Sequence, residues 1–293
     1  MTSQHKVPPL RALLRSGRDD RVGEIVRVTA FVALLHERGA RAYIGLAYLA
    51  ASLAGLSSNN LGRNHMNQDA ATMKLVSVNV GLPREVLWHG RSVSTGIFKE
   101  PVSGRVAVRK LNLDGDRQAD LNVHGGEYKA VYCYPVAHYD YWRKELPGRE
   151  LPTAIFGENF TTDGMLEDSV HLGDRFSVGS AEVIVTQPRL PCYKLGIRFQ
   201  ADDMVKRFLT SGRMGFYLAV TREGEVGAGD EIEVISRDPN RVPVSEITRL
   251  YIAKRYDDDD VASLRRVLRV AAVPESWKGY FRERLERMGI AGE

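Results

Sequence analysis

Cysteine is scarce in this chain of 293 residues, which contains only Cys133 and Cys192. Two thiols cannot build a disulfide framework, and they cannot supply the four thiolates of a typical iron–sulfur or zinc site. One reduced thiol can still act as a nucleophile or as a single metal ligand. The cysteine content therefore favours a reducing, cytoplasmic setting and a site built on one thiol.

Long apolar runs are also missing, because no stretch reaches the roughly 18–20 residues that a membrane-spanning helix needs. The nearest candidate, residues 42–56, is shorter and is interrupted by Ser52. The 41 residues before it are far longer than the usual n-region of a signal peptide. We therefore expect neither a membrane anchor nor secretion.

Excess positive charge is absent from most of the chain. Residues 1–72 carry nine Lys and Arg against five Asp and Glu, which gives +4, and the other 32 residues of each sign cancel. The main part of the chain thus lacks the basic character that attracts phosphate backbones, although a local basic pocket is compatible with these counts. No nucleic-acid polymer is expected as a partner.

Familiar catalytic signatures are absent as well. The chain has no Gly-x-x-x-x-Gly-Lys-Ser/Thr loop and no Gly-x-Ser-x-Gly elbow. Its seven histidines include no pair at a spacing of two, three or four residues, so no compact histidine metal site is predicted. These absences exclude the commonest kinases and hydrolases.

Composition and periodicity divide the chain into three segments. Residues 1–72 are Arg-rich and precede Met73, a natural start of translation, so we interpret them as an accessory leader. Residues 73–243 contain short runs with period-2 alternation, which predicts a mainly β domain. After Pro243 the period changes to 3.6, which predicts a small three-helix domain over residues 244–293.

Within the β domain, strands are expected near residues 73–80, 106–108, 130–134, 182–186 and 216–220. Pro135 is expected in the first turn of a helix that runs to about Leu146. Residues 173–178 resemble residues 229–234, because each segment begins with Gly-Asp and continues as a predicted strand with alternating apolar residues. Such a unit is typical of a meandering barrel, and it also occurs as an ordinary turn.

Apolar stripes in the last segment predict three helices whose aromatic residues lie in a core. The stripes are Ile247, Leu250 and Tyr251; Val261, Leu264 and Leu268; and Trp277, Phe281, Leu285 and Met288.

Two loop segments combine residues of chemical interest. His124-Gly125-Gly126 precedes Lys129, and paired glycines let a backbone approach a ligand closely, although the run also fits a plain turn. Gly157-Glu158-Asn159 offers carboxylate and amide groups that can recognise a heterocycle or can simply stabilise a loop.

A third segment, residues 185–196, contains Cys192 just after a predicted strand. Arg189 and Lys194 flank the sulfur, which favours the thiolate, a soft ligand that suits a redox metal. Cys133 lies on an apolar strand, where we interpret it as a buried structural thiol. The residues alone leave Cys192 open to either a reactive or a structural role.

Taken in order, these motifs resemble the MOSC domain (molybdenum cofactor sulfurase C-terminal domain). The motifs are His-Gly-Gly-x-x-Lys-Ala-Val, Gly-Glu-Asn, Gly-Asp-Arg-Phe and Gln-Pro-Arg-x-Pro-Cys-x-Lys. The chain looks most like the stand-alone subfamily of the bacterial 6-hydroxylaminopurine resistance protein, over about residues 74–240 and the C-terminal helices. The resemblance implies a mainly β, MOSC-type β-barrel with a few helices, followed by a three-helix bundle.

The resemblance also implies a molybdenum cofactor, a molybdopterin with one molybdenum, for which Cys192 is the only protein ligand. Arg189 and Lys194 would neutralise charge on the cofactor. His124 and Glu158 are the candidate proton donors. Further residues implied in the cofactor pocket are Gly125, Gly126, Lys129 and Asn159.

The implied reaction is the two-electron reduction of small N-hydroxylated compounds, such as hydroxylaminopurine-type bases, amidoximes or hydroxamates, for detoxification. Its electrons would come from a separate flavin or iron–sulfur reductase, since the chain carries neither fingerprint. Two alternatives are a sulfurtransferase with a persulfide on Cys192 and a non-catalytic module that binds a pterin or purine. Pyridoxal phosphate binding is a further association of the family as a whole.

Overall fold

A computed structural model of the protein describes residues 72–120 and 125–290. All of the predicted leader except Thr72 lies outside the described residues, as does His124. None of the described helices is long and apolar enough to cross a membrane.

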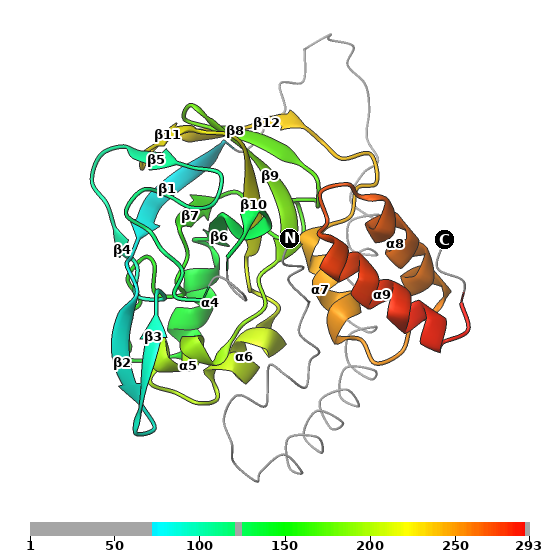
Figure 1. Ribbon diagram of the computed structural model, residues 1–293, viewed down its shortest axis with the longest axis horizontal. Helices are drawn as coiled ribbons and strands as arrows, with labels where there is room; N and C mark the ends of the chain where they lie inside the picture. The colour runs from blue at the N-terminus through cyan, green and yellow to red at the C-terminus, as the bar shows by residue number, and fades with distance from the viewer. Residues whose placement is uncertain (1–71, 121–124, 291–293) are drawn as a thin grey trace, which may run out of the picture. The chain divides into compact units, whose positions relative to one another are not determined.

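Seven strands of the described chain close into a barrel (Figure 1). Every neighbouring pair is antiparallel except β6 and β7, which run parallel. Around the barrel the order is β1 (Met73–Val80), β12 (Glu231–Ser236), β8 (Arg175–Val178), β9 (Ala181–Pro188), β10 (Phe216–Arg222), β6 (Val131–Pro135) and β7 (Phe160–Asp163), which returns to β1.

Shorter strands lie outside this ring. β4 (Glu100–Pro101) pairs with the end of β1, and β5 (Val106–Val108) pairs with β11 (Gly224–Val226). β2 (Arg84–Trp88) and β3 (Arg91–Thr95) form a separate hairpin.

Alternation of apolar residues explains the barrel, as the sequence predicted. In β9, Val183 and Val185 are fully buried, while Glu182 and Ile184, each next to a buried valine, are only partly buried. The two similar Gly-Asp segments lead into β8 and β12, and these strands pair with each other, with Val178 opposite Ile232. The repeat therefore contributes two neighbouring strands of one sheet.

Helices connect some of the strands. η1 (Glu127–Lys129) precedes β6, α4 (His138–Glu145) follows it, and α5 (Tyr193–Phe199) and α6 (Met204–Ser211) lie between β9 and β10. The predicted place of Pro135 in a first helical turn is wrong, because Pro135 is the last residue of β6 and the helix begins at His138. Its side chain lies in a fully buried strand, where it continues the apolar run.

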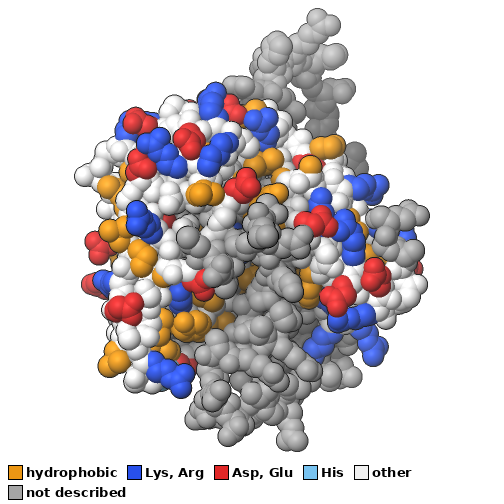
Figure 2. Space-filling model, in the orientation of Figure 1, with side chains coloured by type: hydrophobic (Ala, Val, Ile, Leu, Met, Phe, Trp, Pro, Cys, Tyr) orange, Lys and Arg blue, Asp and Glu red, His pale blue; other side chains and the backbone are white. Residues whose placement is uncertain are grey.

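Three helices complete the fold at the predicted positions: α7 (Val244–Ile252), α8 (Asp258–Arg269) and α9 (Glu275–Arg287). α8 begins with a capping box, in which the Asp257 side chain accepts from the Asp260 backbone and the Asp260 side chain accepts from the Asp257 backbone. Most of the three predicted stripes is buried, but Met288 follows the end of α9 and is 42% exposed. In the space-filling view, acidic and basic side chains intermingle over these helices (Figure 2).

The helices and the barrel share one apolar core that contains, for example, Val185, Ile247 and Phe281. Backbone hydrogen bonds from Leu172 to Val242 and from Val244 to Val170 join the two parts. At the centre of the junction, Trp277 Nε1 donates to Gln187 Oε1 over 2.6 Å. The end of β9, which leads to Cys192, is thus held by α9.

Replacing Trp277 with phenylalanine should lower the free energy of unfolding by about 1–3 kcal/mol, because the buried Gln187 oxygen loses its donor. Urea denaturation followed by circular dichroism measures this change. The matched control is Trp88→Phe in the hairpin, since its half-buried indole has no hydrogen bond to a described residue. Equal losses in the two variants would show that the hydrogen bond has no special weight.

Candidate functional site

A pocket opens where strands β6, β9 and β10 meet the loops that follow β3 and precede β7. Four lining residues are cationic, and none of the lining residues carries a carboxylate. The pocket is lined by Thr95, Gly96, Ile97, Lys99, Gln118, Ala119, Lys129, Tyr132, Phe156, Gly157, Asn159, Arg189, Cys192, Lys194 and Tyr217.

Cys192 reaches this pocket because β9 ends at Pro188 and α5 begins at Tyr193. The cysteine is the N-cap residue of α5, in an extended conformation, and its carbonyl accepts from the Leu195 backbone over 2.9 Å. Its side chain is half-buried, whereas Cys133 is fully buried on β6. Only the thiol of Cys192 therefore lines the pocket.

Arg189 supplies a buried positive charge next to this thiol. Its backbone donates to Gly215 O over 3.1 Å, and its guanidinium carbon lies 5.3 Å from the Tyr132 ring centroid and 5.2 Å from that of Phe208. Burial favours a lower pKa for Arg189, but the charges of Tyr132, Tyr217 and Cys192 raise its pKa above the usual value. The side chain thus stays cationic, and its buried Nη1 has no hydrogen-bond partner among the described residues.

Lys129 and Lys194 bring two more amines to the pocket. Burial lowers the pKa of Lys129 to about 8, and the charge of Cys192 opposes this shift. Gly126 has a φ of 96° and is the N-cap residue of η1. Its carbonyl accepts a hydrogen bond from the Lys129 backbone over 2.9 Å. Gly125 and Gly126 do not line the pocket but precede η1, which contains Lys129, and their role at a cofactor stays a prediction.

The sequence did not reveal a buried network around Asp116. Its carboxylate forms an ion pair with Lys99 Nζ, and it also accepts from the Gly81 backbone over 2.9 Å and from Asn159 Nδ2 over 3.0 Å. Asn159 Oδ1 accepts in turn from the Tyr132 backbone over 3.1 Å. Asn159 lines the pocket as predicted, but its amide mainly joins the pocket walls to each other.

Glu158, which the sequence analysis gave as a candidate proton donor, does not line the pocket. Its fully buried carboxylate accepts from the Tyr139 and Thr161 hydroxyls and from the backbones of Ala154 and Phe156. Burial raises the pKa of Glu158, and the hydrogen bond from Tyr139 partly offsets this effect. Glu158 therefore fixes the loop that carries Asn159.

Gly157, in the same loop, lines the pocket with a φ of 81°. A Cβ atom there would lie 2.7 Å from Ile97 Cγ1 on the opposite wall. Both the left-handed backbone and this close approach require glycine.

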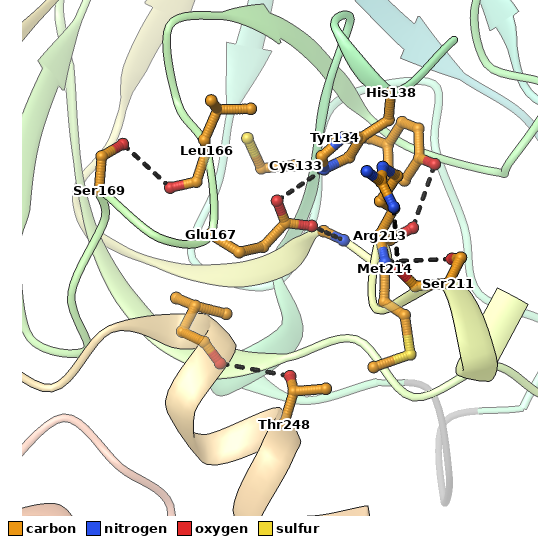
Figure 3. Close-up of polar contacts among 12 residues, drawn as sticks. Cys133, Tyr134, His138, Leu166, Glu167, Ser169, Ser211, Arg213, Met214 and Thr248 are labelled. Atoms are coloured by element: carbon orange, nitrogen blue, oxygen red, sulfur yellow. Dashed lines mark hydrogen bonds and ion pairs between the residues drawn. The ribbon is translucent and has the colours of Figure 1, made fainter. Parts of the chain in front are cut away.

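A second buried carboxylate, Glu167, is connected to the pocket through the turn before β10, and Figure 3 shows its polar contacts. It accepts from the Gly215 backbone over 2.8 Å and lies 2.6 Å from His138 Nε2. The turn that it holds accepts hydrogen bonds from pocket residues, because Met214 O accepts from the Tyr132 hydroxyl over 2.8 Å and Gly215 O accepts from the Arg189 backbone. No sequence motif marked Glu167 or His138, since these residues act through the fold.

The chemistry of the pocket suits an anionic group that brings metal ligands of its own. The described residues include no group of three His, Cys, Asp or Glu side chains that could hold a metal ion. One thiol can supply a single soft bond, and the unpartnered Arg189 Nη1 can donate to an oxyanion. These residues fit a molybdenum cofactor, whose phosphate and dithiolene would supply the negative charge and the remaining ligands.

A β-barrel with a few helices, followed by three C-terminal helices, is the fold class that the resemblance implied. Family models agree, because the MOSC domain matches residues 120–233 and the YiiM-like, 3-alpha helix domain matches residues 242–287, which contain α7–α9. The chain is 38% identical over 214 residues to the uncharacterized protein YflK of Bacillus subtilis (strain 168), covering 73% of this chain and 95% of YflK. The chain therefore belongs to the MOSC family.

Two further comparisons extend this result. The crystal structure of YiiM from Geobacillus stearothermophilus has a TM-score of 0.61 at 34% identity, covering 73% of this chain and 99% of that chain. A protein of Gibberella moniliformis (strain M3125 / FGSC 7600) named "Reductase" is 31% identical over 168 residues, which are 56% of this chain and 30% of that protein. The predicted family and fold class are confirmed.

Replacing Cys192 with alanine should lower the pKa of Lys129 below about 8, because the charge that stabilises its ammonium group is removed. NMR titration of the protein with carbon-13 methylated lysines, assigned with Lys129→Arg, measures this pKa. Cys133→Ala is the matched control, since burial raises the pKa of that thiol to about 12 and keeps it neutral. An unchanged pKa of Lys129 in Cys192→Ala would contradict the coupling.

Proposed function

We propose that the protein is an oxidoreductase that reduces small N-hydroxylated compounds with a molybdenum cofactor bound through Cys192. The observation that carries this proposal is the buried guanidinium of Arg189 beside the half-buried thiol, because its Nη1 atom has no hydrogen-bond partner among the described residues. A buried cation without a carboxylate partner favours an anionic ligand, and the thiol adds one soft metal bond. Family membership supports the same assignment.

When bound, the cofactor would supply the two-electron redox chemistry. Arg189 and Lys194 would hold its anionic groups, and Lys129 would add positive charge near the thiolate. Tyr132 and Tyr217, whose ring centroids lie 5.5 Å apart, give the pocket an aromatic wall for a planar heterocycle. His124 stays the predicted proton donor.

Electrons would come from a separate flavin or iron–sulfur reductase. The fungal protein named "Reductase" supports this idea, because the matching part makes up only 30% of its length. Further segments of such a protein could perform the task that a separate partner performs for this chain.

The protein made in a host that synthesises the molybdenum cofactor should contain stoichiometric molybdenum, and Cys192→Ser should lose it because the only thiolate in the pocket is gone. Mass spectrometry of the purified proteins measures the metal. Cys133→Ser is the matched control and should keep its molybdenum, since that thiol is buried in β6. Wild-type protein without molybdenum from that host would overturn the proposal.

Replacing Glu158 with glutamine should reduce the free energy of unfolding by about 1–3 kcal/mol, because an amide cannot accept all the hydrogen bonds of the carboxylate. The pH profile for reduction of an amidoxime should keep its shape, since Glu158 does not line the pocket. Chemical denaturation and steady-state rates at several pH values measure the two effects. If Glu158→Gln instead loses one of the two slopes of the pH profile while its stability is unchanged, Glu158 acts as a proton donor.

A sulfurtransferase is the second candidate, because a persulfide on Cys192 would also gain from the nearby cations. It predicts sulfur on Cys192 that cyanide releases, in protein without molybdenum. A pterin- or purine-binding module would be indicated if Cys192→Ala bound its ligand as well as the wild type did.

A further inference from the structure

Two more arginines, Arg84 and Arg198, lie over the ring of Phe98. The guanidinium carbon of Arg84 is 3.7 Å from the ring centroid, and that of Arg198 is 4.9 Å from it. Arg84 begins β2, and Arg198 lies in the last turn of α5. Phe98 follows Ile97, which lines the pocket. Two chain segments far apart in the sequence thus place like charges over one ring.

No carboxylate of the described residues pairs directly with either of these two charges. Neither arginine forms an ion pair with a carboxylate in the described residues, and the buried Nε of Arg198 has no hydrogen-bond partner there. Two carboxylates act on Arg198 from a distance, but Glu158 is occupied by four hydrogen bonds and Glu100 is exposed on β4. Burial and the charge of Arg84 lower the pKa of Arg198, so the pair repels itself.

The pair is separate from the cations around the thiol. Arg189 lies over Tyr132 and Phe208, whereas Arg84 and Arg198 lie over Phe98, and neither of them lines the pocket. The two sites are nevertheless close, since α5 carries Arg198 and directly follows Cys192. The pocket and the arginine pair therefore share the segment that contains Ile97 and Phe98.

We propose that Arg84 and Arg198 bind an oxyanion, a phosphate or carboxylate group carried by the substrate whose N-hydroxylated end enters the pocket. Arg198 can donate to two oxygens through Nε and a terminal nitrogen, and Arg84 can donate to a third position. The anion removes the repulsion between the guanidinium groups and supplies the missing partner of Nε. The anion site stands on these contacts alone, while its assignment to a substrate rests on the proposed reductase function.

The direct test is the affinity of the cofactor-free full chain for inorganic phosphate and for acetate, measured by isothermal titration calorimetry. Arg84→Gln and Arg198→Lys should each weaken binding of the preferred anion about tenfold or more, since each loses charge-assisted hydrogen bonds. Arg198→Lys keeps the charge and removes the planar donor pair, which limits damage to the fold. Stronger binding of phosphate or of acetate identifies which group the site prefers.

Two matched variants make the result decisive. Arg91→Gln alters another exposed arginine of the same hairpin and should leave the affinity unchanged. Arg189→Gln removes anion binding in the pocket around the thiol. The affinity of the site at Arg84 and Arg198 for the anion should stay unchanged in this variant. Anion binding that is lost in Arg189→Gln but unchanged in Arg84→Gln and Arg198→Lys would overturn the proposal, as would no binding by the wild type.

Kinetics of the molybdenum-loaded protein test the substrate assignment. For an N-hydroxylated compound with a phosphate or carboxylate, Arg84→Gln should raise KM about tenfold with little change in kcat, while the uncharged parent compound should be unaffected. Equal effects on both compounds would overturn the assignment. A loaded wild type that reduces neither compound, together with anion binding that depends on Arg84 and Arg198, would refute the reductase function and leave the anion site established.

Discussion

Burial of positive charge beside one thiol is the constraint on which the pocket depends. Arg189 is only 5% exposed, and removing a guanidinium from water is costly unless something replaces the lost hydration. The rings of Tyr132 and Phe208 replace part of it, and the coulombic interaction with Cys192 raises the pKa of Arg189. Nη1 has no partner among the described residues, and the proposed anionic ligand would supply one.

The surrounding carboxylates preserve this imbalance because they are used elsewhere. Glu158 accepts four hydrogen bonds, from its own loop, from α4 and from β7. Glu167 binds the turn before β10, and Asp116 pairs with Lys99. Each acid holds one wall of the pocket in place, and none of them lines it. Because these carboxylates hold the pocket wall in place without lining it, none of them is placed as a pocket-lining partner for Arg189.

The sequence predicted the parts of this architecture that depend on local patterns. Alternating residues marked β1 and β9, helical stripes marked α7–α9, and the flanking cations marked Cys192. Local patterns could not reveal that Asp116 meets Lys99 across 17 positions, since only the closed barrel brings the two together. They also could not show which way Glu158 faces, because a Gly-Glu-Asn loop fits a carboxylate turned toward a ligand as well as one turned into the core.

The two cysteines show why the fold, and not residue type, decides the chemistry. Cys133 lies among buried side chains on β6, where burial raises its pKa to about 12 and leaves a neutral thiol at physiological pH. Cys192 lies where a strand has ended and a helix has not yet begun, so its sulfur is half-exposed and shares the pocket with Lys129 and Arg189. A strand end that opens onto cations favours the thiolate, whereas a strand centre excludes it. The position of the proposed metal ligand is therefore defined by the junction of β9 and α5, and a hydrogen bond from α9 to Gln187 holds the end of β9.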